Sequence, residues 1–216
     1  MIKAVVFDLD GLLIDSEPLW HQARVDLFRS FNLIWEQTDQ KNTMGKSTTD
    51  WANYMALKIG ENVSGSKVAE EIITRMEIYY SEHVPILPGA EQTLVSISHE
   101  YPLALASGSP INLIYKVLAT TGWHTMFSEI ISGDDVAEGK PAPTIYLSVA
   151  KTLRITPQEM VVFEDSSSGI LAAHRAGAKI IAVPNYHIKP PMDILDLANI
   201  VLESLNNFSK DLLSSL

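Results

Sequence analysis

The sequence contains no cysteine. This absence excludes disulfide bonds, zinc sites built on thiolates and catalysis by a cysteine nucleophile. Long apolar runs are missing too: no stretch approaches the ~18 consecutive apolar residues of a membrane-spanning helix, and Asp8 interrupts the apolar residues near the start. We therefore expect a cytoplasmic protein with no membrane partner.

Positive charge is scarce. The 216 residues include 16 lysines and arginines against 26 aspartates and glutamates, which gives a formal net charge of -10. An acidic protein repels the phosphate backbone of nucleic acids, and no cluster of basic residues reverses this locally, so we expect no nucleic-acid partner. Apolar residues make up 46% of the chain, enough for one ordinary domain with a modest insertion. Composition leaves the oligomeric state open and is compatible with a monomer.

Short apolar runs rich in β-branched residues predict buried strands. They cover residues 3–7, 103–107, 129–132, 160–163 and 179–183, with residues 200–202 as an additional edge strand. Segments with helical periodicity lie between these runs, for example at residues 111–118 and 145–153. Strands that alternate with helices predict an α/β fold with a doubly wound, Rossmann-like parallel sheet and right-handed crossovers.

Residues 16–85 interrupt this alternation with three helical patterns and no strand signal. Prolines mark both ends of the segment, at Pro18 on one side and at Pro85 on the other. We therefore predict a helical cap domain at residues 16–85, inserted into a core made of residues 1–15 and 86–216.

Acidic pairs follow two of the predicted strands: Asp8 and Asp10 after the first, Glu164 and Asp165 after the fourth. The carboxyl ends of parallel strands are where α/β sheets build their sites, and clustered carboxylates are ligands that suit Mg²⁺. Each pair also has a simpler interpretation, because the first could close a turn and Asp165 or Ser166 could cap the next helix. Capping does not explain why Glu164 ends a buried strand.

Two further segments suit a phosphate group. Ser107, Gly108 and Ser109 follow the second predicted strand, where a hydroxyl, a glycine amide and a helix N-terminus can bind phosphate oxygens. We expect Ser109 to cap the helix that follows. Lys140 lies between a glycine and a proline after the third strand, which fixes the direction of a positive charge. Alone, each segment could be an ordinary capped turn or a solvated loop; their common position at strand ends favours a phosphate site.

Together these residues resemble the haloacid dehalogenase superfamily, and more narrowly its beta-phosphoglucomutase-like branch. Residues 8–18, with the sequence DLDGLLIDSEP, are similar to the opening of sugar-phosphate and hexitol-phosphate phosphatases of that branch. Residues 165–177, with the sequence DSSSGILAAHRAG, match its fourth motif. The resemblance covers essentially the whole chain and implies a helical cap inserted after the first motif.

The resemblance also implies a role for each matching residue. Asp8 would be the nucleophile and a Mg²⁺ ligand, and Asp10 the general acid and base that binds the metal through its backbone carbonyl. Asp165 would complete the Mg²⁺ shell, with Glu164 close to the ion through water. The transferring phosphoryl group would be held by Ser107, Gly108 and Lys140.

Elementary chemistry agrees with these roles. A carboxylate is already an anion at neutral pH, so Asp8 needs no base in order to attack phosphorus. Mg²⁺ and Lys140 would neutralise the phosphoryl oxygens and so reduce the repulsion between the two anions. Asp10 also argues against a dehalogenase, which runs in this family without that residue or a metal. We expect a Mg²⁺-dependent phosphatase that forms a phospho-aspartate on Asp8 and hydrolyses a small phosphorylated metabolite, a sugar or polyol phosphate.

Two alternatives stay open. One is a phosphomutase, although Trp20 stands where mutases of this branch carry a histidine. Alignment on Gly45, Lys46 and Ser47 also places Thr48 where mutases have an arginine for a second phosphate. Trp20 could contact the substrate or belong to the apolar core of the cap. The other alternative is a non-catalytic module that binds a phosphometabolite on the same fold.

Overall fold

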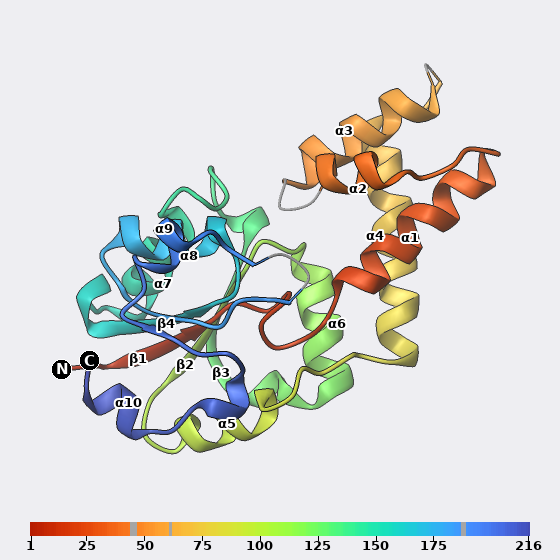
Figure 1. Cartoon of the computed structure of the whole chain (residues 1–216). Coiled ribbons are helices and arrows are strands. Elements are labelled where there is room, and N and C mark those ends of the chain that lie inside the picture. Colours follow the sequence, from red (N-terminus) through yellow and green to blue (C-terminus); the bar gives the residue numbers. More distant parts are fainter. Residues whose placement is uncertain (44–46, 61, 187–188) are drawn as a thin grey trace.

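Six parallel strands form the sheet at the centre of the structure (Figure 1). The structure is a computed structural model that describes residues 1–43, 47–60, 62–186 and 189–216. Two residues of the mutase comparison above, Gly45 and Lys46, lie outside these ranges.

The strand order is β3-β2-β1-β4-β5-β6, and every neighbouring pair is parallel. The strands are β1 (Ala4–Phe7), β2 (Leu103–Ser107), β3 (Phe127–Ser132), β4 (Met160–Glu164), β5 (Lys179–Ala182) and β6 (Ile200–Val201). The predicted doubly wound α/β fold is confirmed. The largest difference in bounds is at β3, which begins two residues before the predicted start because exposed Ser128 separates buried Phe127 from the rest of the strand.

Helices cover both faces of the sheet, and the central strand β1 is therefore buried on both sides. Val5 and Phe7 pack into one apolar cluster, and Val6 packs into the other. The first cluster includes residues of α5 (Ala90–Ser98) and α6 (Ile111–Thr121), and the second includes residues of α7 (Thr144–Leu153) and α8 (Ser167–Ala176). Two short helices, α9 (Met192–Leu195) and α10 (Asp211–Ser214), complete this part of the chain.

Among the described residues, four helices separate β1 from α5 and lie beyond the carboxyl ends of the strands (Figure 1). They are α1 (Glu17–Ser30), α2 (Gln37–Thr43), α3 (Thr48–Ile59) and α4 (Gly65–Glu82). The three helical patterns of the sequence correspond to α1, α3 and α4. Helix α2 was not predicted, because its residues QTDQKNT show no apolar period. This helix is held instead by buried Asp39, which accepts a hydrogen bond from the hydroxyl of Tyr54 (2.6 Å) and forms an ion pair with Lys58 (2.7 Å).

The two connections between the sheet and these four helices lie side by side. The Asp15 amide donates to the Pro85 carbonyl at 2.8 Å, and the Leu87 amide donates to the Leu13 carbonyl at 2.9 Å. Ile14 and Ile86 form an antiparallel bridge between them.

Among the described ranges, no helix combines the length and the apolar character needed to cross a membrane.

Candidate active site

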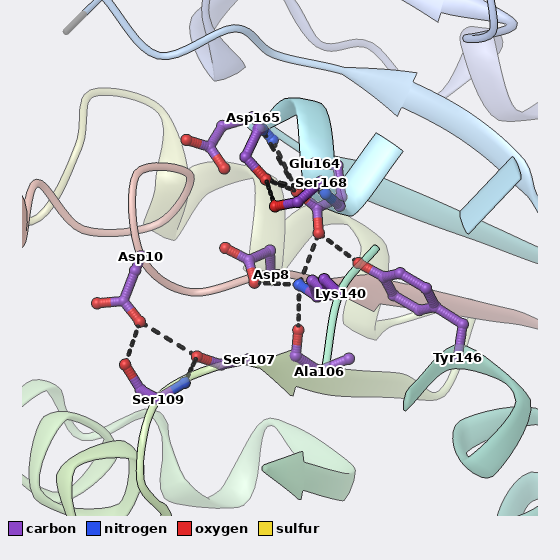
Figure 2. Close-up of polar contacts among 12 residues, drawn as sticks. Asp8, Asp10, Ala106, Ser107, Ser109, Lys140, Tyr146, Glu164, Asp165 and Ser168 are labelled. Carbon is purple, nitrogen blue, oxygen red and sulfur yellow. Dashed lines mark hydrogen bonds and ion pairs between the residues drawn. The ribbon is translucent and has the colours of Figure 1, made fainter. Parts of the chain in front are cut away.

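The residues singled out in the sequence meet at the carboxyl edge of the sheet (Figure 2). Asp8 directly follows β1, Ser107 is the last residue of β2 and Glu164 is the last residue of β4. These three strands are neighbours, so their ends are adjacent. Lys140 reaches the same place from the segment between β3 and α7.

The ammonium group of Lys140 lies at the centre of the site. Its Nζ donates to Asp8 Oδ1 at 2.5 Å, to Glu164 Oε1 at 2.6 Å and to the carbonyl of Ala106 at 3.0 Å. Burial would lower the pKa of Lys140, but the charges of Asp8 and Glu164 outweigh it and raise the pKa well above its usual value. Lys140 is therefore a firmly held cation.

Glu164 is fully buried, and protein donors occupy both of its carboxylate oxygens. Oε1 accepts from Lys140 Nζ and from the hydroxyl of Tyr146 at 2.5 Å. Oε2 accepts from the amide of Asp165 (3.2 Å) and from the amide and hydroxyl of Ser166 (3.4 and 3.2 Å). These contacts fix the carboxylate in one orientation beside Lys140.

Space for the Glu164 carboxylate comes from Gly169 in the first turn of α8. A Cβ atom at Gly169 would lie 1.9 Å from the carboxylate carbon of Glu164. Ser166 is the N-cap of this helix, and its hydroxyl accepts from the Gly169 amide at 3.1 Å. Of the two capping residues considered for this helix, Ser166 is the one that caps, which leaves Asp165 available for the site.

Negative charge exceeds positive charge at this point. Asp8, Glu164 and Asp165 are buried, and one carboxylate oxygen of each lies within 4.8 Å of the others. Burial raises the pKa of Asp8 to about 7, helped by the charges of Glu164 and Asp10 and opposed by Lys140. Burial, followed by the charges of Asp8 and Glu164, raises the pKa of Asp165 well above its usual value. Burial is the largest cause of both shifts, and repulsion between the neighbouring carboxylates adds to it.

The donor set fits a divalent cation. Buried carboxylate oxygens without hydrogen-bond partners in the described structure include Asp165 Oδ1 and Asp10 Oδ1. Unpaired buried carboxylate oxygens are costly unless a cation or water satisfies them. Hard oxygen ligands favour ions such as Mg²⁺. Because donors already surround Glu164, Asp8 and Asp165 are the carboxylates best able to contact the ion directly.

Asp10 belongs to a second, adjacent group of polar residues. Its Oδ2 accepts from the hydroxyl of Ser109 at 2.6 Å and from that of Ser107 at 3.1 Å. The prediction that Ser109 caps the following helix is wrong: α6 begins after Pro110, and Asp134 accepts from the amide of Ile111 at 3.2 Å. Ser109 is free to bind Asp10 because Asp134 takes over the cap.

The structure thus brings most of the singled-out residues into contact, and it adds two that sequence reasoning missed. Asp8, Lys140, Glu164 and Asp165 form one cluster, and Asp10 and Ser107 form the other, with exposed Gly108 between Ser107 and Ser109. The missed residues are Tyr146 and Ser109. A second hydroxyl two positions after Ser107 was a visible signal for Ser109. Tyr146 gave no signal, because a tyrosine at that position also satisfies the apolar period of α7.

Comparisons with known proteins agree with this geometry. A family model described as haloacid dehalogenase-like hydrolase matches residues 5–183. The chain is 33% identical to hexitol phosphatase B of Escherichia coli O157:H7, over 98% of this chain and 97% of that protein. It is 29% identical to a phosphorylated carbohydrates phosphatase of Thermotoga maritima, over 98% and 100%. The crystal structure of beta-phosphoglucomutase from Clostridium difficile has a TM-score of 0.84 and 27% identity, covering 100% of this chain and 96% of that one.

The close approach of Gly169 to Glu164 leads to a first prediction. Gly169→Ala should destabilise the protein by about 1–3 kcal/mol, because the new methyl group displaces a carboxylate that several donors hold in place. An ordinary glycine-to-alanine change inside a helix would stabilise by up to ~1 kcal/mol, the opposite sign. Chemical denaturation measures the difference. Gly139→Ala is the control, because a Cβ at Gly139 meets no atom within 4 Å. A stabilised Gly169→Ala protein would contradict the packing described for Glu164.

The raised pKa of Asp8 leads to a second prediction. Because this pKa is about 7 in the cation-free protein, Asp8 is increasingly protonated as the pH falls below that value, and a bound cation must displace the proton. The apparent affinity for Mg²⁺ should weaken at least about tenfold between about pH 8 and about pH 6. Calorimetric titration over this range measures the change. An affinity that stays constant with pH would show that Asp8 is already fully ionised without the ion.

Proposed function

The chain belongs to the haloacid dehalogenase-like hydrolase family, and on this basis we propose that it is a Mg²⁺-dependent phosphatase acting through a phospho-aspartate on Asp8. Its substrate is a small phosphorylated metabolite, a sugar or polyol phosphate. One observation carries the proposal: the Asp8 carboxylate lies 2.5 Å from the ammonium of Lys140, in a cluster where three carboxylates share that single positive charge. An anionic nucleophile in this position would attack a phosphoryl group when a divalent cation offsets the excess of negative charge.

In the first step, an oxygen of ionised Asp8 attacks phosphorus, and the bond between phosphorus and the substrate oxygen breaks. The leaving oxygen takes a proton from Asp10. In the second step, Asp10 takes a proton from a water molecule, which attacks phosphorus and releases Asp8. Asp10 suits both transfers, because Ser107 and Ser109 hold its Oδ2 while Oδ1 has no hydrogen-bond partner in the described structure. Acid–base help of this kind typically contributes ~10²–10⁴-fold.

The remaining residues hold charge and position. Asp8, Asp165 and the backbone carbonyl of Asp10 would hold Mg²⁺, with Glu164 in an outer position. When bound, the ion neutralises negative charge on the phosphoryl oxygens. Lys140 supplies further positive charge, and the phosphoryl group is bound by Ser107 and the amide of Gly108.

We also propose that residues 16–85 are a cap domain that closes over this site and selects the leaving group, while residues 1–15 and 86–216 form the catalytic core. The position of α1 to α4 beyond the carboxyl ends of the strands supports this division (Figure 1). The preference for a sugar or polyol phosphate rests on the similarity to hexitol phosphatase B and to the phosphorylated carbohydrates phosphatase. Such metabolites belong to the cytoplasm, which is the location we propose.

The phosphomutase alternative is supported by the similarity to beta-phosphoglucomutase. The cap gives it less support. Trp20 is buried and packs edge-on against Trp51, with ring centroids 6.0 Å apart, so it contributes to the apolar core of the cap. Thr48 begins α3 and carries no charge for a second phosphate. A non-catalytic binding module would not need Asp10 poised between two hydroxyls, so hydrolysis is the function that the geometry supports best.

Phosphate release from a panel of hexose, hexitol, glycerol and nucleotide phosphates tests the proposal. We expect release with Mg²⁺ that is abolished by EDTA and reduced at least ~10³-fold in Asp8→Asn, which removes the nucleophile. The control is Asp193→Asn, an exposed carboxylate on α9 that should leave the rate unchanged.

Two outcomes would reject the proposal. Release that persists in Asp8→Asn would place the activity elsewhere. No release from any phosphate by the intact protein with Mg²⁺ would reject hydrolysis. Isomerisation of a hexose phosphate in the presence of its bisphosphate would then assign the mutase reaction.

A further inference from the structure

We infer that Tyr146 is a positioning residue for phosphoryl transfer: its hydroxyl holds Glu164 so that Lys140 stays shared with Asp8. The inference rests on the proposed function and extends it to a residue outside the motifs. Tyr146 lies in the first turn of α7, shortly after Lys140, and is completely buried (Figure 2).

Packing accounts for the ring of Tyr146 but not for its hydroxyl. The ring belongs to the apolar cluster that includes Ile145 and Val149 of the same helix. A phenylalanine would fill this space equally well, and it would avoid burying a polar group. The hydroxyl instead donates to Glu164 Oε1 at 2.5 Å, and this contact affects how strongly Glu164 holds Lys140.

That consequence follows from competition for one ammonium group. Lys140 Nζ lies 2.5 Å from Asp8 Oδ1 and 2.6 Å from Glu164 Oε1, so two carboxylates share a single cation. Tyr146 donates to the same Oε1 atom that accepts from Lys140. A second donor satisfies part of the negative charge on that oxygen and weakens its hold on Lys140.

The Tyr146 ring also limits where the ammonium can move. Nζ of Lys140 lies 5.2 Å from the ring centroid, within the range of a cation–π contact. Amides and the hydroxyl of Ser166 fix the other oxygen of Glu164. The Glu164 carboxylate is therefore held against rotation and cannot draw the ammonium of Lys140 away from Asp8.

Without the hydroxyl, Glu164 Oε1 would keep Lys140 as its one donor in this cluster and would bind it more closely. Less positive charge would then reach the phosphoryl oxygens while Asp8 attacks. The loss falls on the transfer step, since Ser107, Gly108 and the cap still bind the substrate. Tyr146→Phe should therefore lower kcat about tenfold and change KM by less than about twofold.

A structural role alone predicts a different pattern, which Val149→Ala provides as a control. Val149 is fully buried one turn further along α7 and has no part in the polar cluster. Val149→Ala should lower Tm more than Tyr146→Phe does, because it leaves a cavity, while kcat stays within about twofold of the intact protein. A tenfold loss of kcat in both variants would show that disturbing α7 is sufficient and would overturn the inference.

A double-mutant cycle with Glu164→Gln tests whether Tyr146 acts through Glu164. The hydroxyl has no carboxylate to restrain in that background, so adding Tyr146→Phe should cost less than about twofold in kcat. A full tenfold cost there would assign Tyr146 another role and overturn the inference. An unchanged kcat of Tyr146→Phe in an enzyme that Asp8→Asn inactivates would overturn the inference alone. An intact protein that releases no phosphate would reject the proposed function, and this inference with it.

Discussion

The ammonium of Lys140, held between the carboxylates of Asp8 and Glu164, is the interaction on which the rest of the site depends. Three buried carboxylates at the end of a parallel sheet repel one another, and burial makes that repulsion strong because little water screens it. A single lysine reduces the repulsion only in part. Burial and the remaining repulsion together raise the pKa of Asp8, and a divalent cation of the kind we propose would relieve that repulsion.

The surrounding fold can be understood from this constraint. Gly169 is small enough for the Glu164 carboxylate to lie against α8. Gly11 has a φ of +87°, and a Cβ there would lie 2.2 Å from Asp165 Oδ2, so the turn after β1 also requires a residue without a side chain. Both glycines allow backbone to approach a carboxylate closely. Their positions match the two carboxylates that differ most: Glu164 is surrounded by donors, whereas Asp165 keeps an oxygen without a partner in the described structure.

The fold and most of the candidate site could be predicted from the sequence, because both depend on where the buried strands lie and which residues stand at their carboxyl ends. Once β1, β2 and β4 are adjacent, Asp8, Ser107 and Glu164 must lie close together, and short apolar runs identify such strands well. Contacts that depend on side-chain direction were beyond that reasoning. Ser109 turns toward Asp10 because Asp134, distant in the sequence, satisfies the start of α6. Tyr146 and α2 were missed for different reasons: the ring of Tyr146 fits the apolar period of α7 and so conceals the role of its hydroxyl, whereas α2 is held by a buried carboxylate and has no apolar period.

The pairing of the two connections between the sheet and helices α1 to α4 restricts how these parts can move. Two separate tethers would allow the helices to tilt and twist independently about the sheet. Hydrogen bonds from Asp15 to Pro85 and from Leu87 to Leu13 join the two connecting segments into one narrow two-stranded ribbon. Such a ribbon bends out of its own plane more easily than it bends sideways within that plane. A ribbon of this kind behaves as a hinge with one preferred axis. In the closure that we propose for residues 16–85, such a hinge would return the same face of the helices to Asp8 each time, so a stereochemical preference among substrates could be built on that face.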